Sequence, residues 1–187
     1  MEVPYSGRAI LNDNLNGFEI TIPTKKNWFL TLFLGVWLYG WGMGEFSAID
    51  MFNGFLVSDF EFFSFFIIIW LCVWSVAGFF VFKTIIWNLT GKEVITFGQG
   101  QLTIEKKGSL FSKPKSYDLK EVTKFRVKEE ENKSGFWGVK KDASNGTIRF
   151  DYGMKTVKFG IEVEEAEAYF IIDTLKSKKI LTEENYL

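Results

Sequence analysis

The organisation of this chain is decided by one apolar stretch, FFSFFIIIWLCVWSVAGFFVF, at positions 62–82. Fourteen of its 21 residues are Leu, Ile, Val or Phe, and none is charged. At roughly −0.3 to −0.6 kcal/mol for each such residue, these side chains favour insertion into a bilayer by about 4 to 8 kcal/mol. About 20 apolar residues match the thickness of the hydrocarbon core. The stretch therefore predicts a transmembrane helix over about residues 62–87.

An earlier apolar segment, at 28–44, predicts a first transmembrane helix that is shorter and richer in glycine. Gly40 and Gly44 have the spacing that lets two membrane helices approach closely, and Ser75 and Gly78 offer small residues on the second helix. The alternative is that the glycines only weaken or kink the first helix. The residues expected to pack the helices together are Gly35, Gly40, Gly44, Ser75 and Gly78.

The charges that flank the two apolar segments predict their orientation. Lys25 and Lys26 precede the first segment, Lys83 and Lys92 follow the core of the second, and the intervening stretch 45–61 has no basic residue. Basic residues are enriched on the cytoplasmic side of membrane proteins. We therefore expect a transmembrane helical hairpin over 28–87, with both termini in the cytoplasm and the 45–61 loop outside.

The predicted outer loop carries four carboxylates. Such groups at a membrane can form an entry point for a cation or a proton, so a small ion- or proton-conducting protein is one alternative function. Carboxylates at the membrane edge can equally be ordinary solvated groups. The four residues concerned are Glu45, Asp50, Asp59 and Glu61.

Residues 88–187 change in character and predict a cytoplasmic α+β domain of antiparallel strands followed by one helix. Alternating apolar residues predict strands near 94–97, 102–104, 117–119, 125–127, 148–152 and 157–161. The period then changes to that of a helix over 164–179. Its inward face would carry Ala168, Ile171, Ile172 and Leu175.

The N-terminal segment 1–27 contains a further strand candidate at 17–23. Phe18, Ile20 and Ile22 alternate with polar residues, and Pro23 ends the run. With both termini in the cytoplasm, this strand can join the sheet built after the membrane segments. The helical hairpin would then be an insertion within the domain. The alternative is an extended linker that pairs with nothing.

Two short motifs and the following helix carry a family resemblance. IRFDYG at 148–153 leads into KTVKFG at 155–160, and a Glu- and Ala-rich helix begins at Glu164. Together with the hairpin, this layout resembles membrane-anchored bacterial proteins with a pleckstrin-homology-like (PH-like) domain. The resemblance implies a seven-stranded curved sheet or barrel closed by a C-terminal helix, in a non-enzymatic protein. It does not imply phosphoinositide binding, because fold and ligand are separable.

Several lysines occur in close pairs. Lys106–Lys107, Lys113–Lys115 and Lys140–Lys141 could attract anionic lipid headgroups, each Lys contributing about 1 kcal/mol when it lies near the membrane surface. An ordinary solvated surface is the alternative.

Phe136 and Trp137 stand in an otherwise polar, lysine-flanked stretch. Large aromatic side chains need an apolar environment, which could be the domain's own core, the lipid interface or a partner protein. With the lysines, the candidate lipid or partner contacts are Phe136, Trp137, Lys140, Lys141, Lys106 and Lys107.

The composition excludes several chemistries. The chain has no histidine and one cysteine, so a disulfide framework, a histidine-based zinc site and a Ser-His triad are excluded. The 22 basic and 23 acidic residues argue against a nucleic-acid binder. We therefore expect no enzyme, no catalytic residues, no cofactor and no metal.

These observations together predict a non-catalytic integral membrane protein. We expect a scaffold, an assembly factor or an accessory subunit of a larger membrane complex, in contact with lipid and with a protein partner or a second copy of itself. An anionic-lipid-sensing membrane module is the first alternative, and conduction through the loop carboxylates is the second.

Overall fold

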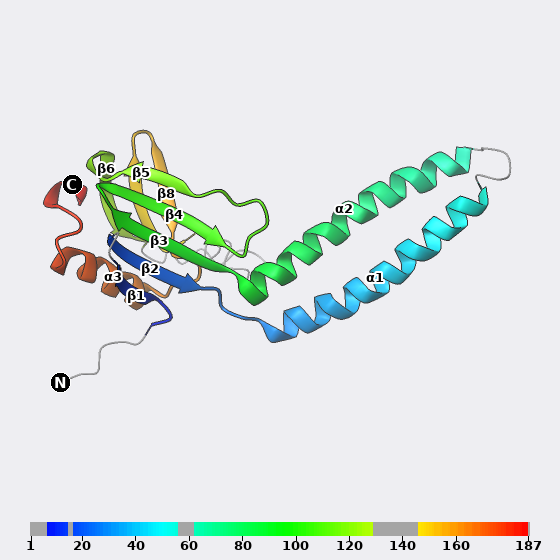
Figure 1. Ribbon diagram of the computed structural model, residues 1–187, viewed down its shortest axis with the longest axis horizontal. Helices are drawn as coiled ribbons and strands as arrows, with labels where there is room; N and C mark the ends of the chain where they lie inside the picture. The colour runs from blue at the N-terminus through cyan, green and yellow to red at the C-terminus, as the bar shows by residue number, and fades with distance from the viewer. Residues whose placement is uncertain (1–6, 15–16, 56–61, 129–145, 187) are drawn as a thin grey trace. The chain divides into compact units, whose positions relative to one another are not determined.

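The protein, seen here as a computed structural model, is described over residues 7–14, 17–55, 62–128 and 146–186 (Figure 1). It divides into two compact units. The helical unit is Lys26–Thr90. The sheet unit combines Met1–Lys25 with Gly91–Leu187, so it is built from chain on both sides of the helical unit.

Two antiparallel helices make up the helical unit: α1 (Trp28–Phe55) and α2 (Phe62–Thr90). Asn88 joins the beginning of α1 to the end of α2, because its Oδ1 accepts the N–H of Asn27 at 3.1 Å and its Nδ2 donates to the Asn27 carbonyl at 2.9 Å. Farther along, the indole N–H of Trp41 donates to the carbonyl of Trp74 at 3.2 Å. These contacts fix the pairing of the two helices along their length.

Helix α1 is longer than the sequence predicted. It continues without a break to Phe55, so the predicted boundary at residue 44 and most of the predicted loop 45–61 are wrong. No proline interrupts this stretch, and the Ser47 hydroxyl donates to the Met43 carbonyl within the helix at 2.9 Å. Only Phe65–Thr90, within the described residues, is both long and apolar enough to cross a membrane by length and composition.

The described part of the sheet unit contains eight strands in two antiparallel sheets, in the orders β1-β2-β3-β4-β5 and β6-β7-β8. The first sheet consists of β1 (Ile10–Asn14), β2 (Gly17–Pro23), β3 (Lys92–Gly98), β4 (Gln101–Lys107) and β5 (Lys115–Asp118). The second consists of β6 (Val122–Val127), β7 (Ile148–Tyr152) and β8 (Lys155–Phe159). Helix α3 (Glu165–Ser177) and two 3-10 turns, η1 (Leu119–Glu121) and η3 (Glu183–Asn185), complete the unit.

The α+β class predicted from the sequence is therefore confirmed, with local differences. Strand β1 was not predicted. The predicted strand at 117–119 ends at Asp118, because the Asp118 side chain accepts the N–H of Lys120 at 3.0 Å and starts η1 instead. The predicted strand at 157–161 lies two residues earlier, as β8.

The core of the sheet unit lies between the two sheets and α3. The fully buried Phe150 stacks on Phe125, with ring centroids 5.7 Å apart, and meets Phe159 at 6.2 Å. Helix α3 contributes the apolar face that the sequence predicted, and all four of its members are buried: Ala168, Ile171, Ile172 and Leu175.

Strand β2 pairs with β3, which lies beyond both helices in the sequence. Pro23 is the cross-strand partner of Lys92, and the N–H of Thr24 donates to the Gly91 carbonyl at 3.1 Å. The chain therefore leaves the sheet unit for α1 and returns from α2 at one end of the sheet. We call this end the connecting end, and the opposite end, with the β3–β4 turn at Gln99–Gly100, the distal end.

Candidate functional site

A buried carboxylate lies at the connecting end. Glu93, on β3, is 2% exposed, and its Oε2 accepts the N–H groups of Gly160 at 2.7 Å and Ile161 at 3.1 Å. Burial raises the pKa of Glu93, although the two backbone N–H groups and the charge of Lys106 act in the opposite direction. Glu93 thus fastens the β8–α3 connection to the strand that follows α2.

Other polar contacts hold the same end together. The buried Glu167 of α3 accepts the N–H of Ala9 at 2.7 Å, and Glu162 accepts the N–H of Lys25 at 3.0 Å. The guanidinium of Arg8 donates to the carbonyls of Pro23 and Glu162. The N-terminal segment, the end of β2 and the β8–α3 connection are therefore joined at the connecting end.

Three exposed lysines lie at this end of β3 and β4. The predicted lipid-contact residues Lys106 and Lys107 end β4, where Lys107 is the cross-strand partner of Lys92 and Lys106 is the partner of Glu93. Lys107 also forms an ion pair with Glu105 at 3.6 Å. The sequence did not predict Lys92 as a lipid contact, because only the strand register places it beside Lys107.

The remaining predicted lipid or partner contacts belong to the segment between β6 and β7. Phe136, Trp137, Lys140 and Lys141 lie outside the described residues.

Of the small residues predicted to pack the helices, two lie at the contact between α1 and α2. Gly78 is buried against the indole of Trp41, and the Ser75 hydroxyl donates to Glu45 Oε1. Gly35, Gly40 and Gly44 have no atom within 4 Å of the position that a Cβ would take. The prediction that these three glycines bring α1 close to α2 is wrong, because they lie away from that contact.

Tryptophans take the place of small residues in the helix contact. Trp74 stacks on Trp70 with centroids 5.0 Å apart and meets Trp37 of the other helix at 6.2 Å. Large rings therefore fill the space between the helices, and a glycine is needed only where Trp41 lies against α2.

Of the four carboxylates of the conduction hypothesis, the structure describes two. Glu45 lies in the helix contact with Ser75, whereas Asp50 is exposed on α1. Asp59 and Glu61 lie outside the described residues.

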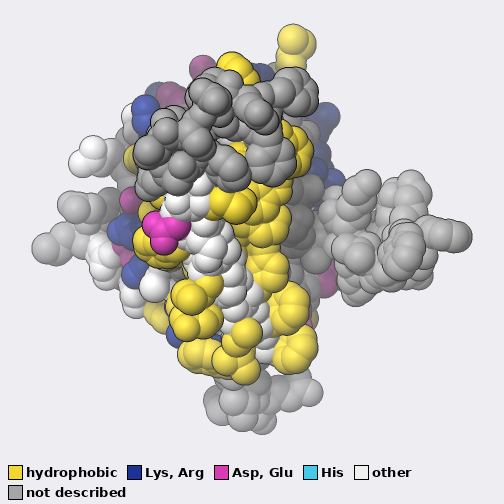
Figure 2. All heavy atoms as spheres, turned by 90° about the vertical axis from the view of Figure 1, so that its right-hand side faces the viewer, with side chains coloured by type: hydrophobic (Ala, Val, Ile, Leu, Met, Phe, Trp, Pro, Cys, Tyr) yellow, Lys and Arg dark blue, Asp and Glu magenta, His cyan; other side chains and the backbone are white. Residues whose placement is uncertain are grey.

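Outside the helix contact, the described surface of the helical unit is mainly apolar, and Figure 2 shows hydrophobic side chains gathered over the helices. Phe29 is 82% exposed. Other large apolar side chains that face outward are Trp28, Phe33, Val36 and Phe46 on α1 and Phe65, Phe66, Ile69, Val73 and Phe80 on α2.

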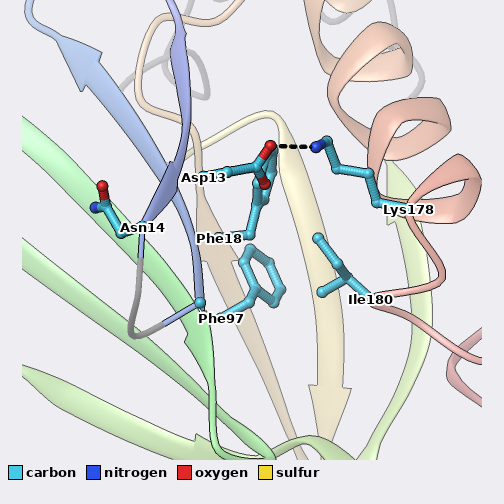
Figure 3. Close-up of a pocket in the computed structure, with 7 residues that line it drawn as sticks. Asp13, Asn14, Phe18, Phe97, Lys178 and Ile180 are labelled. Carbon is cyan, nitrogen blue, oxygen red and sulfur yellow. Dashed lines mark hydrogen bonds and ion pairs between the residues drawn. The ribbon is translucent and has the colours of Figure 1, made fainter.

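An open pocket of about 400 Å³ lies at the distal end, between β1, β2, β3 and the end of α3 (Figure 3). An ion pair between Asp13 and Lys178, 2.6 Å long, spans it. The Lys178 ammonium also lies 5.1 Å from the centre of the Phe18 ring. The two charges neutralise each other and attach α3 to the edge strand, which is a structural role.

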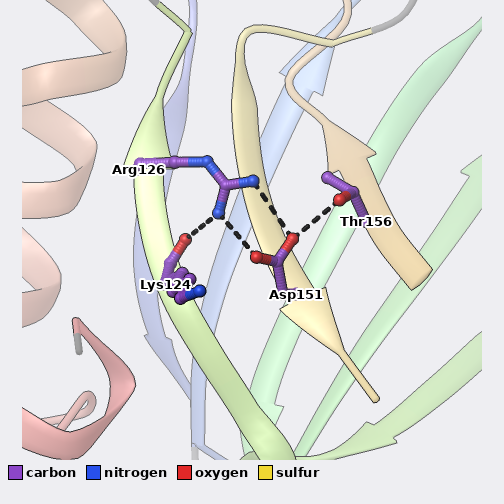
Figure 4. Close-up of polar contacts among 4 residues, drawn as sticks. All are labelled: Lys124, Arg126, Asp151 and Thr156. Atoms are coloured by element: carbon purple, nitrogen blue, oxygen red, sulfur yellow. Dashed lines mark hydrogen bonds and ion pairs between the residues drawn. The ribbon is translucent and has the colours of Figure 1, made fainter. Parts of the chain in front are cut away.

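A second polar cluster crosses the smaller sheet (Figure 4). Arg126 on β6 binds Asp151 on β7 through two hydrogen bonds of 3.0 and 3.1 Å, and Thr156 on β8 donates to the same carboxylate at 2.7 Å. The Arg126 hydrogen bonds hold the pKa of Asp151 below its ordinary value. This cluster ties the three strands together on an exposed face.

The described residues hold no group of three or more Cys, Asp or Glu side chains that could bind a metal ion. The chain matches no protein-family model, no curated protein and no solved structure. The features that point to a function are therefore those of the chain itself: the apolar helix pair and the connecting end of the sheet unit.

Proposed function

We propose that this chain is an integral protein of the bacterial inner membrane. Helices α1 and α2 both cross the bilayer, and the sheet unit is a PH-like domain on the cytoplasmic side, together with both termini. The role is non-catalytic, as a scaffold, an assembly factor or an accessory subunit of a larger membrane complex.

The pairing of β2 with β3 is the observation that carries the proposal. These strands flank the helical unit in the sequence, yet Pro23 and Lys92 are partners in one sheet. A water-exposed sheet lies on one side of a membrane, so the chain between the two strands crosses the bilayer an even number of times. Helix α2 has the length and composition of a membrane span, and α1 supplies the second crossing in this proposal.

The outward surface of the helices supports the same proposal. A helix that is apolar on all sides belongs in a protein core or in a membrane. The large apolar side chains on both helices face away from the helix contact, and Phe29 and Trp28 are largely exposed. Lipid is the environment that would cover them.

The order of the strands supports the PH-like domain. Without the edge strand β1, the sheet unit has four strands, β2 to β5, then three, β6 to β8, and then α3. That makes seven antiparallel strands and a C-terminal helix, which is the arrangement that the resemblance implies.

A role with a partner is supported by the glycines on the outer side of α1. Gly35 lies in an open groove of about 470 Å³, lined by Trp28, Thr31, Leu32, Gly35, Val36 and Tyr39. Small residues let a second membrane helix approach closely. A partner helix, or a second copy of this chain, fits against α1 there.

The proposal is tested by mapping the membrane topology. In a Cys72→Ser background, which removes the only cysteine, single cysteines are introduced as Asn12→Cys, Ser58→Cys and Lys120→Cys. We expect an impermeant maleimide to label position 58 in intact spheroplasts and positions 12 and 120 only after lysis. The protein should also stay in the membrane pellet after carbonate extraction.

Two outcomes would overturn the proposal. Positions 12 and 120 could be labelled on opposite sides of the membrane, which contradicts an even number of crossings. Carbonate could also release the chain as a soluble protein, which contradicts the transmembrane helices themselves.

A second candidate function is an anionic-lipid-sensing module, and the location of Lys92, Lys106 and Lys107 at the connecting end of β3 and β4 favours it. The affinity of such a module for its protein partner would depend on the fraction of anionic lipid in the membrane. Partner recovery that is unchanged between neutral and anionic vesicles would favour the scaffold instead.

A further inference from the structure

We propose that the β4–β5 turn, residues 108–114, is a second membrane anchor. In it the Phe111 ring enters the interface of the cytoplasmic leaflet, and the surrounding lysines bind anionic lipid headgroups. This inference rests on the proposed function, because it assumes that α1 and α2 cross the bilayer.

The location of the turn follows from the strand register. Strand β4 runs toward the connecting end, where its last residue, Lys107, pairs with Lys92. Only Gly91 separates Lys92 from the last residue of α2, Thr90. The β4–β5 turn begins directly after Lys107, so it extends from the end of the sheet unit at which the chain meets the membrane.

The turn presents an aromatic ring to the solvent. Phe111 is 87% exposed, and its backbone has a φ of 66°, a left-handed conformation that a bulky residue rarely adopts. The preceding Gly108 has a φ of 82°. A backbone held in an unfavourable conformation so that a large apolar side chain faces outward is typical of a functional contact.

The charges around the turn fit an anionic surface. Lys106 and Lys107 precede it, and Lys113 and Lys115 frame its end, and all four are exposed. Of the nearby carboxylates, Glu93 is buried, and the ion pair of Glu105 with Lys107 offsets one of the four positive charges. The result is an exposed ring with cationic groups on both sides.

An anionic lipid leaflet is the partner that fits this combination. Phe, Trp and Leu side chains of interfacial segments insert at the boundary between headgroups and acyl chains, and lysines are attracted to the anionic lipids of the cytoplasmic leaflet. The proposed transmembrane helices are joined to the sheet unit at this end. The turn therefore reaches the lipid headgroups without a separate protein that recruits the domain to the membrane.

The test uses the full-length chain in the Cys72→Ser background, reconstituted into vesicles of phosphatidylcholine with or without phosphatidylserine. Phe111→Cys carries an environment-sensitive NBD label. Met154→Cys, labelled in the same way, is the matched control, because Met154 is also fully exposed in a tight turn but lies at the distal end.

We expect the label at position 111 to emit at shorter wavelength and to be quenched by spin-labelled lipid in the anionic vesicles, with a smaller effect in the neutral ones. The label at position 154 should behave as in water in both. Adding Lys107→Gln and Lys113→Gln should reduce the quenching at position 111, whereas Lys120→Gln and Lys155→Gln, which alter the distal end, should not.

Equal, water-like emission at positions 111 and 154 in anionic vesicles would overturn the inference. Carbonate extraction of the same samples separates this failure from a failure of the proposed function. If the protein resists extraction but position 111 remains in water, only the second anchor is wrong. If carbonate removes the protein from the vesicles, the transmembrane proposal is wrong as well.

Discussion

The indole ring of Trp41 fills the space beside Gly78 that a side chain would take. A Cβ placed on Gly78 would lie 2.3 Å from Cζ2 of that ring, far inside van der Waals contact. The same indole is fixed by its hydrogen bond to the Trp74 carbonyl. The ring therefore has little freedom to move, and Gly78 is the residue that lets α1 and α2 meet.

Gly78→Ala should accordingly weaken the packing of the helices. Forcing an extra carbon into a filled contact costs about 1 to 3 kcal/mol. Gly40→Ala is the control, because the same carbon meets nothing within 4 Å and alanine favours the helix by about 1 kcal/mol. Unfolding of the purified protein in detergent, followed by tryptophan fluorescence, measures both. Equal midpoints for the two variants would contradict the helix contact described here.

Phe150→Ala should be among the most damaging substitutions in the sheet unit. Removing a fully buried Phe costs about 3 to 5 kcal/mol, through lost apolar contact and the cavity left behind. Met154→Ala, on the same hairpin but fully exposed, should change the free energy of unfolding by less than about 0.5 kcal/mol. Urea titration followed by circular dichroism compares the two. A small effect of Phe150→Ala would mean that the core is not packed as described.

The stability of the sheet unit should depend on pH through Glu93. Burial raises the pKa of Glu93 in the folded unit above its ordinary 4.5, so the folded state binds the proton more tightly than the unfolded chain. The resulting stabilisation is complete below the unfolded pKa and is lost as the pH rises through the folded pKa. Asp151, whose pKa is lowered, acts in the opposite direction and loses its contribution as the pH falls.

Glu93→Gln isolates the first of these effects. The amide oxygen can still accept the N–H groups of Gly160 and Ile161, but the group no longer titrates. The difference in melting temperature between wild type and variant should therefore change as the pH rises from 4.5. Glu105→Gln, on the neighbouring strand, is the control. A constant difference across the pH range would contradict the role of burial at Glu93.

The sheet unit should fold without the helices when its two parts are joined directly. The N–H of Thr24 already bonds to the Gly91 carbonyl, so a short Gly/Ser turn can connect residues 7–25 to residues 91–187. We expect a soluble monomer with cooperative unfolding, as measured by size exclusion and near-ultraviolet circular dichroism.

Residues 91–187 alone are the matching control, and they should not fold. They lack the buried side chains of Phe18, Ile20 and Ile22, each of which contributes about 1.5 to 3 kcal/mol. The loss is comparable to the whole stability of a typical domain, about 5 to 15 kcal/mol. A well-folded 91–187 fragment would show that β2 is dispensable.

Much of the fold follows from local patterns. The alternation of Phe18, Ile20 and Ile22 predicts a strand, and all three side chains are buried in β2. The helical period after Glu164 predicts α3 and its inward face. By contrast, β1 reads ILNDN, which has no apolar alternation, because as an edge strand it pairs on one side only and is largely exposed.

The candidate sites were harder to predict, because they depend on what lies across from each residue. The spacing of Gly40 and Gly44 identifies a small surface on α1 but not the side on which it lies, and tryptophans fill the contact with α2 instead. Similarly, the sequence separates Lys92 from Lys107, and only the strand register brings them together. Phe111 lies between the two lysine pairs that the sequence singles out, but only the structure shows that it is exposed.

Because β2 and β3 belong to one sheet, the order of synthesis constrains how the protein folds. The ribosome completes β2 before either helix and must add the 65 residues of Lys26–Thr90 before β3 can begin. At roughly 5 to 20 residues per second, this takes about 3 to 13 seconds. During that interval β2 can pair with β1, but β3 and the later elements that cover its apolar face have not yet been made. The emerging chain is thus most vulnerable to aggregation before its second half has been translated.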